Sequence, residues 1–250
     1  MRYAVIAMMV LHGSARDVHR KYACVRTAPY HPQIHNMGNV GPCGYVHAKM
    51  ARLATKVIDE VAYGGRNIRR EFAELLRSRD VPSNLIEVGC GVGTLTHELA
   101  RVDHFERIRA FDTSNVMIAQ ARTFAKSNDE MGNVEFEVQN ACDVGSLTAD
   151  IAVSSFMMHE LPVEAHEDVL HALLECTKQR RGEAWIMDID TTYSPSAAML
   201  SGEPYVEAYL SSIDHTMSRV AEENGVGMSV VLLLRNHVRL WRFKHLDETA

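Results

Sequence analysis

Residues 84–93 read Asn-Leu-Ile-Glu-Val-Gly-Cys-Gly-Val-Gly, and this stretch decides the fold. A short apolar run from Leu85 to Val88 leads into glycines spaced by single residues, and an amphipathic segment follows at once. Strand, glycine-rich turn and helix bring bare backbone close to a ligand, because glycine tolerates a positive φ and carries no Cβ. The helix behind the turn presents unpaired N–H groups. The stretch therefore predicts a nucleoside-cofactor site.

The spacing of the glycines distinguishes between cofactors. A dinucleotide-binding turn has the pattern G-x-G-x-x-G. Counted from Gly89, the third glycine position holds Thr94, and counted from Gly91 it holds Thr96. The observed G-x-G-x-G, preceded by the acidic Glu87, instead resembles motif I of the class I S-adenosylmethionine-dependent methyltransferases. The spacing disfavours an NAD-dependent oxidoreductase, which stays as a less favoured alternative.

The downstream sequence agrees with this resemblance at successive predicted strands. Asp112 ends a second short predicted strand, 19 residues beyond Gly93, where a carboxylate in a Rossmann-like fold holds the ribose hydroxyls. Residues 133–139 alternate apolar and polar side chains and lead to Asn140-Ala141, which resembles the motif that reads adenine. The family usually has Asp where Asn140 stands, although the amide carbonyl can still accept from an exocyclic amine. Residues 150–161 and 184–188 resemble the fourth and fifth strands.

The order of strand and helix patterns predicts an α/β fold with a doubly wound, mostly parallel sheet. Residues 230–234 and 238–243 flank Arg235-Asn236, a tight connection that indicates a C-terminal antiparallel hairpin. The resemblance implies seven strands in all. We expect one domain overall, with an irregular N-terminal extension (1–44), an N-terminal helical cap (45–82) and the Rossmann-like core (83–250).

The resemblance implies S-adenosylmethionine as the cofactor and S-adenosylhomocysteine as its product. The sulfonium methyl would pass to an acceptor nucleophile by in-line displacement, in which positioning alone is worth roughly 7–11 kcal/mol. The residues that the resemblance assigns to the cofactor are Glu87, Gly89, Cys90, Gly91 and Gly93 at the amino-acid end, Asp112 and Thr113 at the ribose, Asn140 and Ala141 at the adenine, and Ser155 under the methionine part.

His159 and Glu160 are the candidate catalytic residues, since they follow the fourth strand, near the place where the methyl group would emerge. A histidine there could take a proton from the acceptor, because its ordinary pKa is close to neutral pH. The alternative for His159 is packing or hydrogen bonding within the loop. For Glu160 the alternative is capping of the following helix.

Residues around the predicted acceptor pocket carry charges of both signs. Asp188 and Asp190 end the fifth strand, with Glu203 beyond, and these acids would suit a cationic or amine acceptor. The favoured alternative for them is helix capping and hydrogen bonding within loops. Tyr63, Arg66 and Arg69 border Gly64-Gly65, and the two arginines could clasp a carboxylate or a phosphate bidentately. For Arg69, as for Arg70, a solvated position on the helix is the favoured alternative. The sign of the acceptor's charge therefore stays open. His35 and Asn36 lie in a loop that could cover the substrate, and the pair His31 and His35 makes a poor metal site, so no metal is predicted.

Composition excludes several other classes of protein. The 250 residues are 46% hydrophobic, enough for one substantial core, and the net charge of −6 gives no electrostatic case for nucleic acid. No stretch is long enough to cross a bilayer. The five cysteines lack C-x-x-C spacing, which indicates a reducing compartment. We expect a cytoplasmic protein, with organelle targeting or a signal peptide in residues 1–30 as the alternative.

The sequence thus favours a small-molecule methyltransferase that acts as a monomer or homodimer and binds neither nucleic acid nor membrane. A non-catalytic relative that binds S-adenosylmethionine and serves as a regulatory or partner subunit is the principal alternative, because cofactor binding does not prove turnover.

Overall fold

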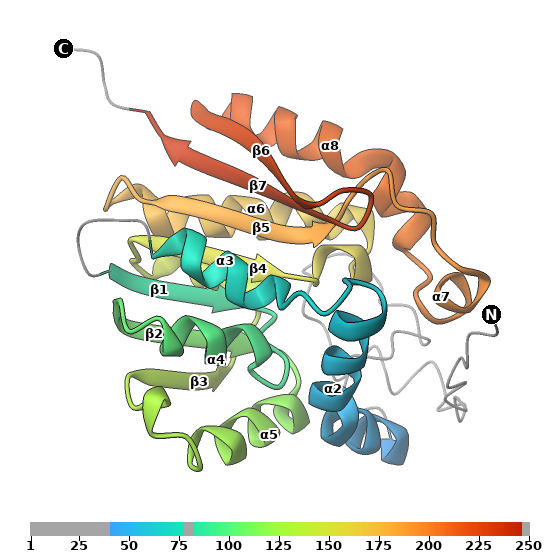
Figure 1. Cartoon of the computed structure of the whole chain (residues 1–250). Helices are drawn as coiled ribbons and strands as arrows, with labels where there is room; N and C mark the ends of the chain where they lie inside the picture. Colours follow the sequence, from blue (N-terminus) through green and yellow to red (C-terminus); the bar gives the residue numbers. More distant parts are fainter. Residues whose placement is uncertain (1–40, 78–82, 247–250) are drawn as a thin grey trace.

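The computed structural model describes residues 41–77 and 83–246. Within these ranges the chain forms a seven-stranded sheet in the order β3-β2-β1-β4-β5-β7-β6 (Figure 1). Neighbouring strands are parallel from β3 to β5, whereas β7 is antiparallel to both β5 and β6. This arrangement confirms the predicted fold class. The strands are β1 (Ser83–Val88), β2 (Phe105–Asp112), β3 (Val134–Val138), β4 (Ile151–Ser155), β5 (Glu183–Ile189), β6 (Val226–Leu234) and β7 (Val238–His245).

Helices cover both faces of the sheet, so the core has two apolar layers. Helices α3, α4 and α5 supply one layer and helices α6 and α8 the other (Figure 1). The remaining elements are short or lie at the edge of the sheet. The helices are α2 (Gly41–Val61), α3 (Ile68–Leu76), α4 (Thr94–Arg101), α5 (Asn115–Ala125), α6 (Val163–Lys178), α7 (Ala197–Gly202) and α8 (Val206–Glu223), with 3-10 turns η1 (Asp129–Met131), η2 (Ala141–Ser146) and η3 (Met158–Glu160).

The central strands are apolar on both faces, because each face is covered by helices. In β1, Leu85 packs into the layer of α3 and α4, while Ile86 and Val88 pack into the layer of α6 and α8. Burying side chains of this size contributes about 1.5–3 kcal/mol each. Because side chains alternate along a strand, Glu87 lies on the same face as Leu85, toward α4.

The C-terminal hairpin closes at Asn236, whose φ of +61° is one that asparagine adopts more readily than most residues. The turn lies between β6 and β7, as the sequence predicts. Trp241 of β7 is fully buried, and its indole Nε1 donates to Asp214 of α8 at 2.9 Å. The hairpin is therefore tied to the helix that covers it.

The two N-terminal helices do not form one cap. Phe72 of α3 is fully buried and lies 6.1 Å from Trp185 of β5 between ring centroids, so α3 belongs to the core. Of these two helices, α2 is the one that flanks the edge of the sheet where β1, β2 and β4 end (Figure 1). The predicted segment 45–82 is thus divided, because the apolar side of α3 fits a sheet face. Residues 1–40 of the predicted N-terminal extension (1–44) lie outside the described residues. No helix in residues 41–77 or 83–246 is long and apolar enough to span a membrane.

Candidate functional site

A cavity of about 520 Å³ opens at the carboxyl edge of the parallel strands. Its size is that of a small-molecule site, and its position is the one where open α/β sheets bind ligands. The wall comes from α2, from the turn after β1, and from the ends of β2, β3 and β4. The predicted site residues that line it are Tyr63, Gly89, Cys90, Gly91, Asp112, Thr113, Asn140, Ala141, Ser155, His159 and Glu160.

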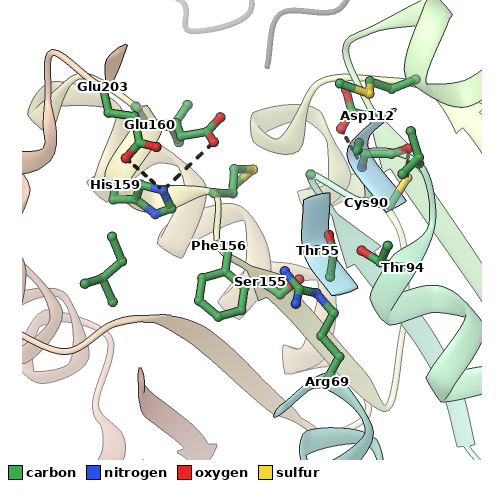
Figure 2. Close-up of a pocket in the computed structure, with 18 of the residues that line it drawn as sticks. Thr55, Arg69, Cys90, Thr94, Asp112, Ser155, Phe156, His159, Glu160 and Glu203 are labelled. Carbon is green, nitrogen blue, oxygen red and sulfur yellow. Dashed lines mark hydrogen bonds and ion pairs between the residues drawn. The ribbon is translucent and has the colours of Figure 1, made fainter. Parts of the chain in front are cut away.

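The glycine turn and the end of β2 are joined through one carboxylate. Asp112 Oδ2 accepts from the Gly91 N–H at 2.8 Å, and Oδ1 accepts from the Ser114 N–H at 2.8 Å. Gly91 has a φ of +54°, and a Cβ built there would meet no atom within 4 Å. The turn therefore presents bare backbone to the cavity, as glycine allows. Figure 2 shows Asp112 above Cys90 at this end of the cavity.

Asn140 lines the cavity at the end of β3, next to Ala141. Its side-chain carbonyl accepts from the Cys142 N–H at 3.0 Å and caps the η2 turn. A carbonyl oxygen has a second lone pair, so this contact still leaves it able to accept from a ligand.

Two residues of the predicted cofactor set lie outside the cavity lining. Glu87 is fully buried, and the Thr96 hydroxyl of α4 donates to its Oε2 at 2.6 Å. Burial raises the pKa of this carboxyl to about 8, although the Thr96 hydrogen bond opposes the shift. Gly93 is the N-cap of α4 and faces the Phe136 ring, which would lie 3.0 Å from a Cβ at this position. Strand alternation and helix packing thus direct both positions away from the cavity.

At the other end of the cavity, a buried carboxylate holds the ring of His159. Asp188 Oδ1 lies 2.5 Å from His159 Nδ1, and Asp188 Oδ2 accepts from the Met158 N–H at 2.8 Å. Asp188 is fully buried behind the wall and does not line the cavity. It therefore contacts His159 rather than a ligand, which corrects its predicted role in substrate binding.

The second ring nitrogen of His159 faces two more carboxylates. Nε2 lies 3.6 Å from Glu203 Oε2 and 3.9 Å from Glu160 Oε1 (Figure 2). Burial of the ring lowers its pKa, but Asp188, Glu203 and Glu160 together raise the pKa of His159 to about 10. Burial raises the pKa of Glu160 to about 8, with His159 opposing and Glu203 adding to the shift. Near neutral pH His159 is therefore an imidazolium inside an acidic pocket.

Comparisons with known proteins agree with this geometry. Residues 85–180 match the family model described as a methyltransferase domain. The chain has the class I S-adenosylmethionine-dependent methyltransferase fold. No curated protein matches this sequence.

Solved structures share this methyltransferase fold at low sequence identity. A SAM-dependent methyltransferase from Aquifex aeolicus is 17% identical, with a TM-score of 0.55 over 71% of this chain and 89% of that one. The plantazolicin methyltransferase BamL, solved with a triazolic desmethylPZN analog and S-adenosylhomocysteine, is 14% identical, with a TM-score of 0.56 over 92% of this chain and 99% of that one. Magnesium protoporphyrin IX methyltransferase from Synechocystis PCC 6803, solved with S-adenosylmethionine, is 15% identical (TM-score 0.54, 95% and 100%).

Several predicted substrate residues do not line the cavity. Arg66 forms an ion pair with Glu71 and donates to the Leu233 carbonyl at 2.9 Å, because its side chain turns toward β6. Asp190 pairs with Arg239 at 2.8 Å and accepts from the Asn236 N–H at 2.9 Å, so it anchors the hairpin. His35 and Asn36 lie outside the described residues.

Arg69 lines the cavity, whereas the sequence favours a solvated side chain over a clasp for a carboxylate or phosphate. Its side chain is 14% exposed, and its guanidinium carbon lies 4.7 Å from the centroid of the Phe156 ring. The sequence spacing could have predicted this position, because Arg69 is three and four residues before Phe72 and Ala73, on the same buried face of α3. Glu203, which the sequence groups with Asp188 and Asp190 as acidic residues suited to a cationic acceptor, also lines the cavity.

Proposed function

We propose that this protein transfers the methyl group of S-adenosylmethionine to a small-molecule acceptor, releasing S-adenosylhomocysteine. The observation that carries the proposal is a single cavity with two chemically different ends. The glycine turn, Asp112 and Asn140 line one end, and His159, Glu160 and Glu203 line the other. In-line displacement requires that the methyl donor and the acceptor be in contact within the same cavity.

The first end suits an adenosyl ligand. The open space at Gly91 admits the ligand against backbone, and the adjacent Asp112 carboxylate is placed to accept from ribose hydroxyls. Asn140 and Ala141 would read the adenine edge, with Ser155 near the methionine part. Two structures with this fold, BamL and the Synechocystis enzyme, hold S-adenosylhomocysteine and S-adenosylmethionine respectively, which supports the choice of cofactor.

The second end suits an acceptor that loses a proton as it is methylated. The acceptor atom forms a bond to the methyl carbon, the carbon–sulfur bond breaks, and the acceptor's proton must go to a base. Because His159 is already protonated near neutral pH, we assign the base to Glu160, whose pKa of about 8 makes it a proton carrier in the working range. His159 would then orient the acceptor and offset the negative charge of the two glutamates.

Calorimetric titration with S-adenosylmethionine, S-adenosylhomocysteine and NAD in parallel tests the cofactor. We expect the two adenosyl-sulfur ligands to bind and NAD not to bind. Binding of NAD alone would overturn the assignment of the glycine turn. If none of the three ligands binds in the titration, cofactor binding by this chain is refuted.

Transfer itself is tested by incubating the protein with methyl-labelled S-adenosylmethionine and pools of amines, thiols and hydroxy compounds. We expect a labelled product whose rate rises with pH through about 8 as Glu160 ionises. Glu160→Gln should abolish that rise while the affinity for S-adenosylhomocysteine is kept. Tight cofactor binding without a labelled product from any pool would favour the non-catalytic partner subunit.

A further inference from the structure

The sheet has two outer edges, and they differ in length and in charge. Strand β3 forms one edge and β6 the other (Figure 1). β3 has five residues, of which Glu135 and Glu137 are charged. Both glutamates form ion pairs with arginines of β2, for Glu137 with Arg109 at 3.0 Å. Because short strands and charged side chains prevent an edge from pairing with another chain, the β3 edge is protected.

The β6 edge is longer and carries no charge. From Val226 to Leu234 it reads Val-Gly-Met-Ser-Val-Val-Leu-Leu-Leu, nine residues without a charged side chain or a proline. The side chains of Val230, Val231 and Leu232 are 44%, 39% and 50% exposed. Since neighbouring side chains on a strand point to opposite faces, apolar groups are exposed on both faces of this edge. An edge of this kind is a template for another strand.

The backbone of β6 is open on its outer side. β6 is the last strand of the sheet and pairs with β7 alone. Every second residue of such a strand directs its N–H and C=O away from the sheet. The register shifts between Leu232 and Leu234, and the Leu233 carbonyl accepts from Arg66 at 2.9 Å. Within residues 41–77 and 83–246, residues 226–232 make no backbone hydrogen bond beyond the ladder with β7, so this part of the edge is regular and open.

The charges at the two ends of this open edge indicate which partner fits it. Glu222 is exposed near the end of α8, just before β6 begins, and Arg235 is exposed in the turn that follows β6. If two copies of β6 pair antiparallel about a two-fold axis near Ser229, the start of each strand lies beside the end of the other. Each Glu222 would then lie near the partner's Arg235, and no like charges would meet along the strands. A second copy of this chain therefore complements the edge.

We propose that the β6 edge is a homodimer interface, in which the β6 strands of two copies pair antiparallel and join their sheets into one. The pairing adds backbone hydrogen bonds and covers the exposed side chains of Val230, Val231 and Leu232 in both copies. Because the contact is two-fold symmetric and the β3 edge is charged, assembly stops at two copies. The interface is independent of the proposed function, since residues 226–235 do not line the cavity.

Sedimentation equilibrium over a range of protein concentrations tests the interface. We expect the wild-type mass to rise from one chain to two. For Val230→Lys we expect the dimer Kd to rise at least about 100-fold, because each copy would bury an ammonium group against the partner's apolar strand. Val138→Lys is the matched control, because Val138 is a 53% exposed valine on the β3 edge, and its dimer Kd should equal that of wild type. Leu53→Lys, on the exposed apolar side of α2, should also leave Kd unchanged.

Exchange of the end charges tests the antiparallel arrangement. Glu222→Lys and Arg235→Glu should each raise the dimer Kd about two- to tenfold, as for exposed ion pairs. The double variant exchanges the charges between the two ends and should restore the wild-type Kd. An unchanged Kd in both single variants, or no recovery in the double variant, would overturn this arrangement of the strands.

Other outcomes would overturn the interface itself. One is a wild-type protein that stays monomeric up to its solubility limit. Another is a dimer that persists in Val230→Lys and dissociates in Leu53→Lys, which would assign the contact to α2. If Val230→Lys does not fold, hydrogen exchange of the wild-type protein decides. The amides of residues 229–232 should exchange at least about tenfold more slowly at concentrations where the dimer forms, and equal exchange at low and high concentration would refute pairing at this edge.

Discussion

Replacement of Asp188 by asparagine tests whether one buried carboxylate keeps His159 protonated. Asparagine has the shape of aspartate and retains one acceptor oxygen, but it removes the charge that lies 2.5 Å from His159 Nδ1. Without that charge, burial of the ring is opposed only by Glu203 and Glu160. We therefore expect the pKa of His159 to fall well below 10.

The same change has a calculable effect on the free energy of unfolding. A pKa raised from 6.5 to about 10 corresponds to about 5 kcal/mol of preference for the protonated ring, shared among the three carboxylates. Because the folded pKa is raised, this stabilisation is fully present below 6.5 and is lost as pH rises through about 10. We expect Asp188→Asn to lower the free energy of unfolding by about 3–5 kcal/mol near pH 6.5, with a smaller difference toward pH 10.

Two measurements check this prediction, and a neighbouring residue supplies the control. Urea denaturation across this pH range gives the free energies, and NMR titration of the histidine rings, assigned with His159→Gln, gives the pKa. Asp190→Asn is the control, because Asp190 is buried at the same strand end and pairs with Arg239 rather than with His159. It should destabilise the protein by an amount that does not vary between pH 6.5 and 10. A His159 ring that still titrates near 10 in Asp188→Asn would refute the reasoning.

Three further changes test other parts of the site. Asp112→Ala should weaken binding of S-adenosylhomocysteine at least about tenfold, because each charge-assisted hydrogen bond to the ribose is worth about 1.5–3 kcal/mol; unchanged affinity in calorimetry would remove Asp112 from the site. Gly91→Ala should also weaken binding of S-adenosylhomocysteine more than about tenfold, since the added methyl enters the open space of the turn. The positive φ of this residue should cost only about 1–2 kcal/mol of folding stability. A large loss of stability with normal affinity for the ligand would contradict this prediction. For Glu87, whose pKa is raised from 4.5 to about 8, ionisation of the unfolded chain lowers the stability of the wild-type protein across that window. Glu87→Gln should therefore gain stability relative to wild type as pH rises from 4.5 to 8, and a pH-independent difference in urea denaturation would show that Glu87 is ionised in the folded protein.

The site residues that could be predicted from the sequence are those placed by local pattern. Gly89, Gly91, Asp112 and Ser155 follow directly from the ends of strands, and the carboxyl ends of parallel strands meet at one edge. Asp188 and Asp190 also end a strand, yet both are buried and paired, because β7 and η3 cover that end. The sequence does not show which distant element covers a strand end.

The charged residues near the N-terminal helices show the same limit. Arg66 and Arg69 are three positions apart, but one donates to a β6 carbonyl and the other enters the cavity beside Phe156. Their directions depend on how α3 packs on the sheet, which involves residues more than a hundred positions away. Propensity and periodicity contain no such information.

The sequence by itself determined the order of strands and helices, the glycine turn and the antiparallel hairpin, since periodicity and turn chemistry act over a few neighbouring residues. Only the tertiary structure decided which charges meet. It placed His159 between Asp188, Glu160 and Glu203, and it left Arg69 in the cavity wall without a hydrogen bond among the described residues. The physical reason is that pKa and ligand-binding capacity depend on burial and on distances of a few ångströms between side chains, which are set when remote segments pack together.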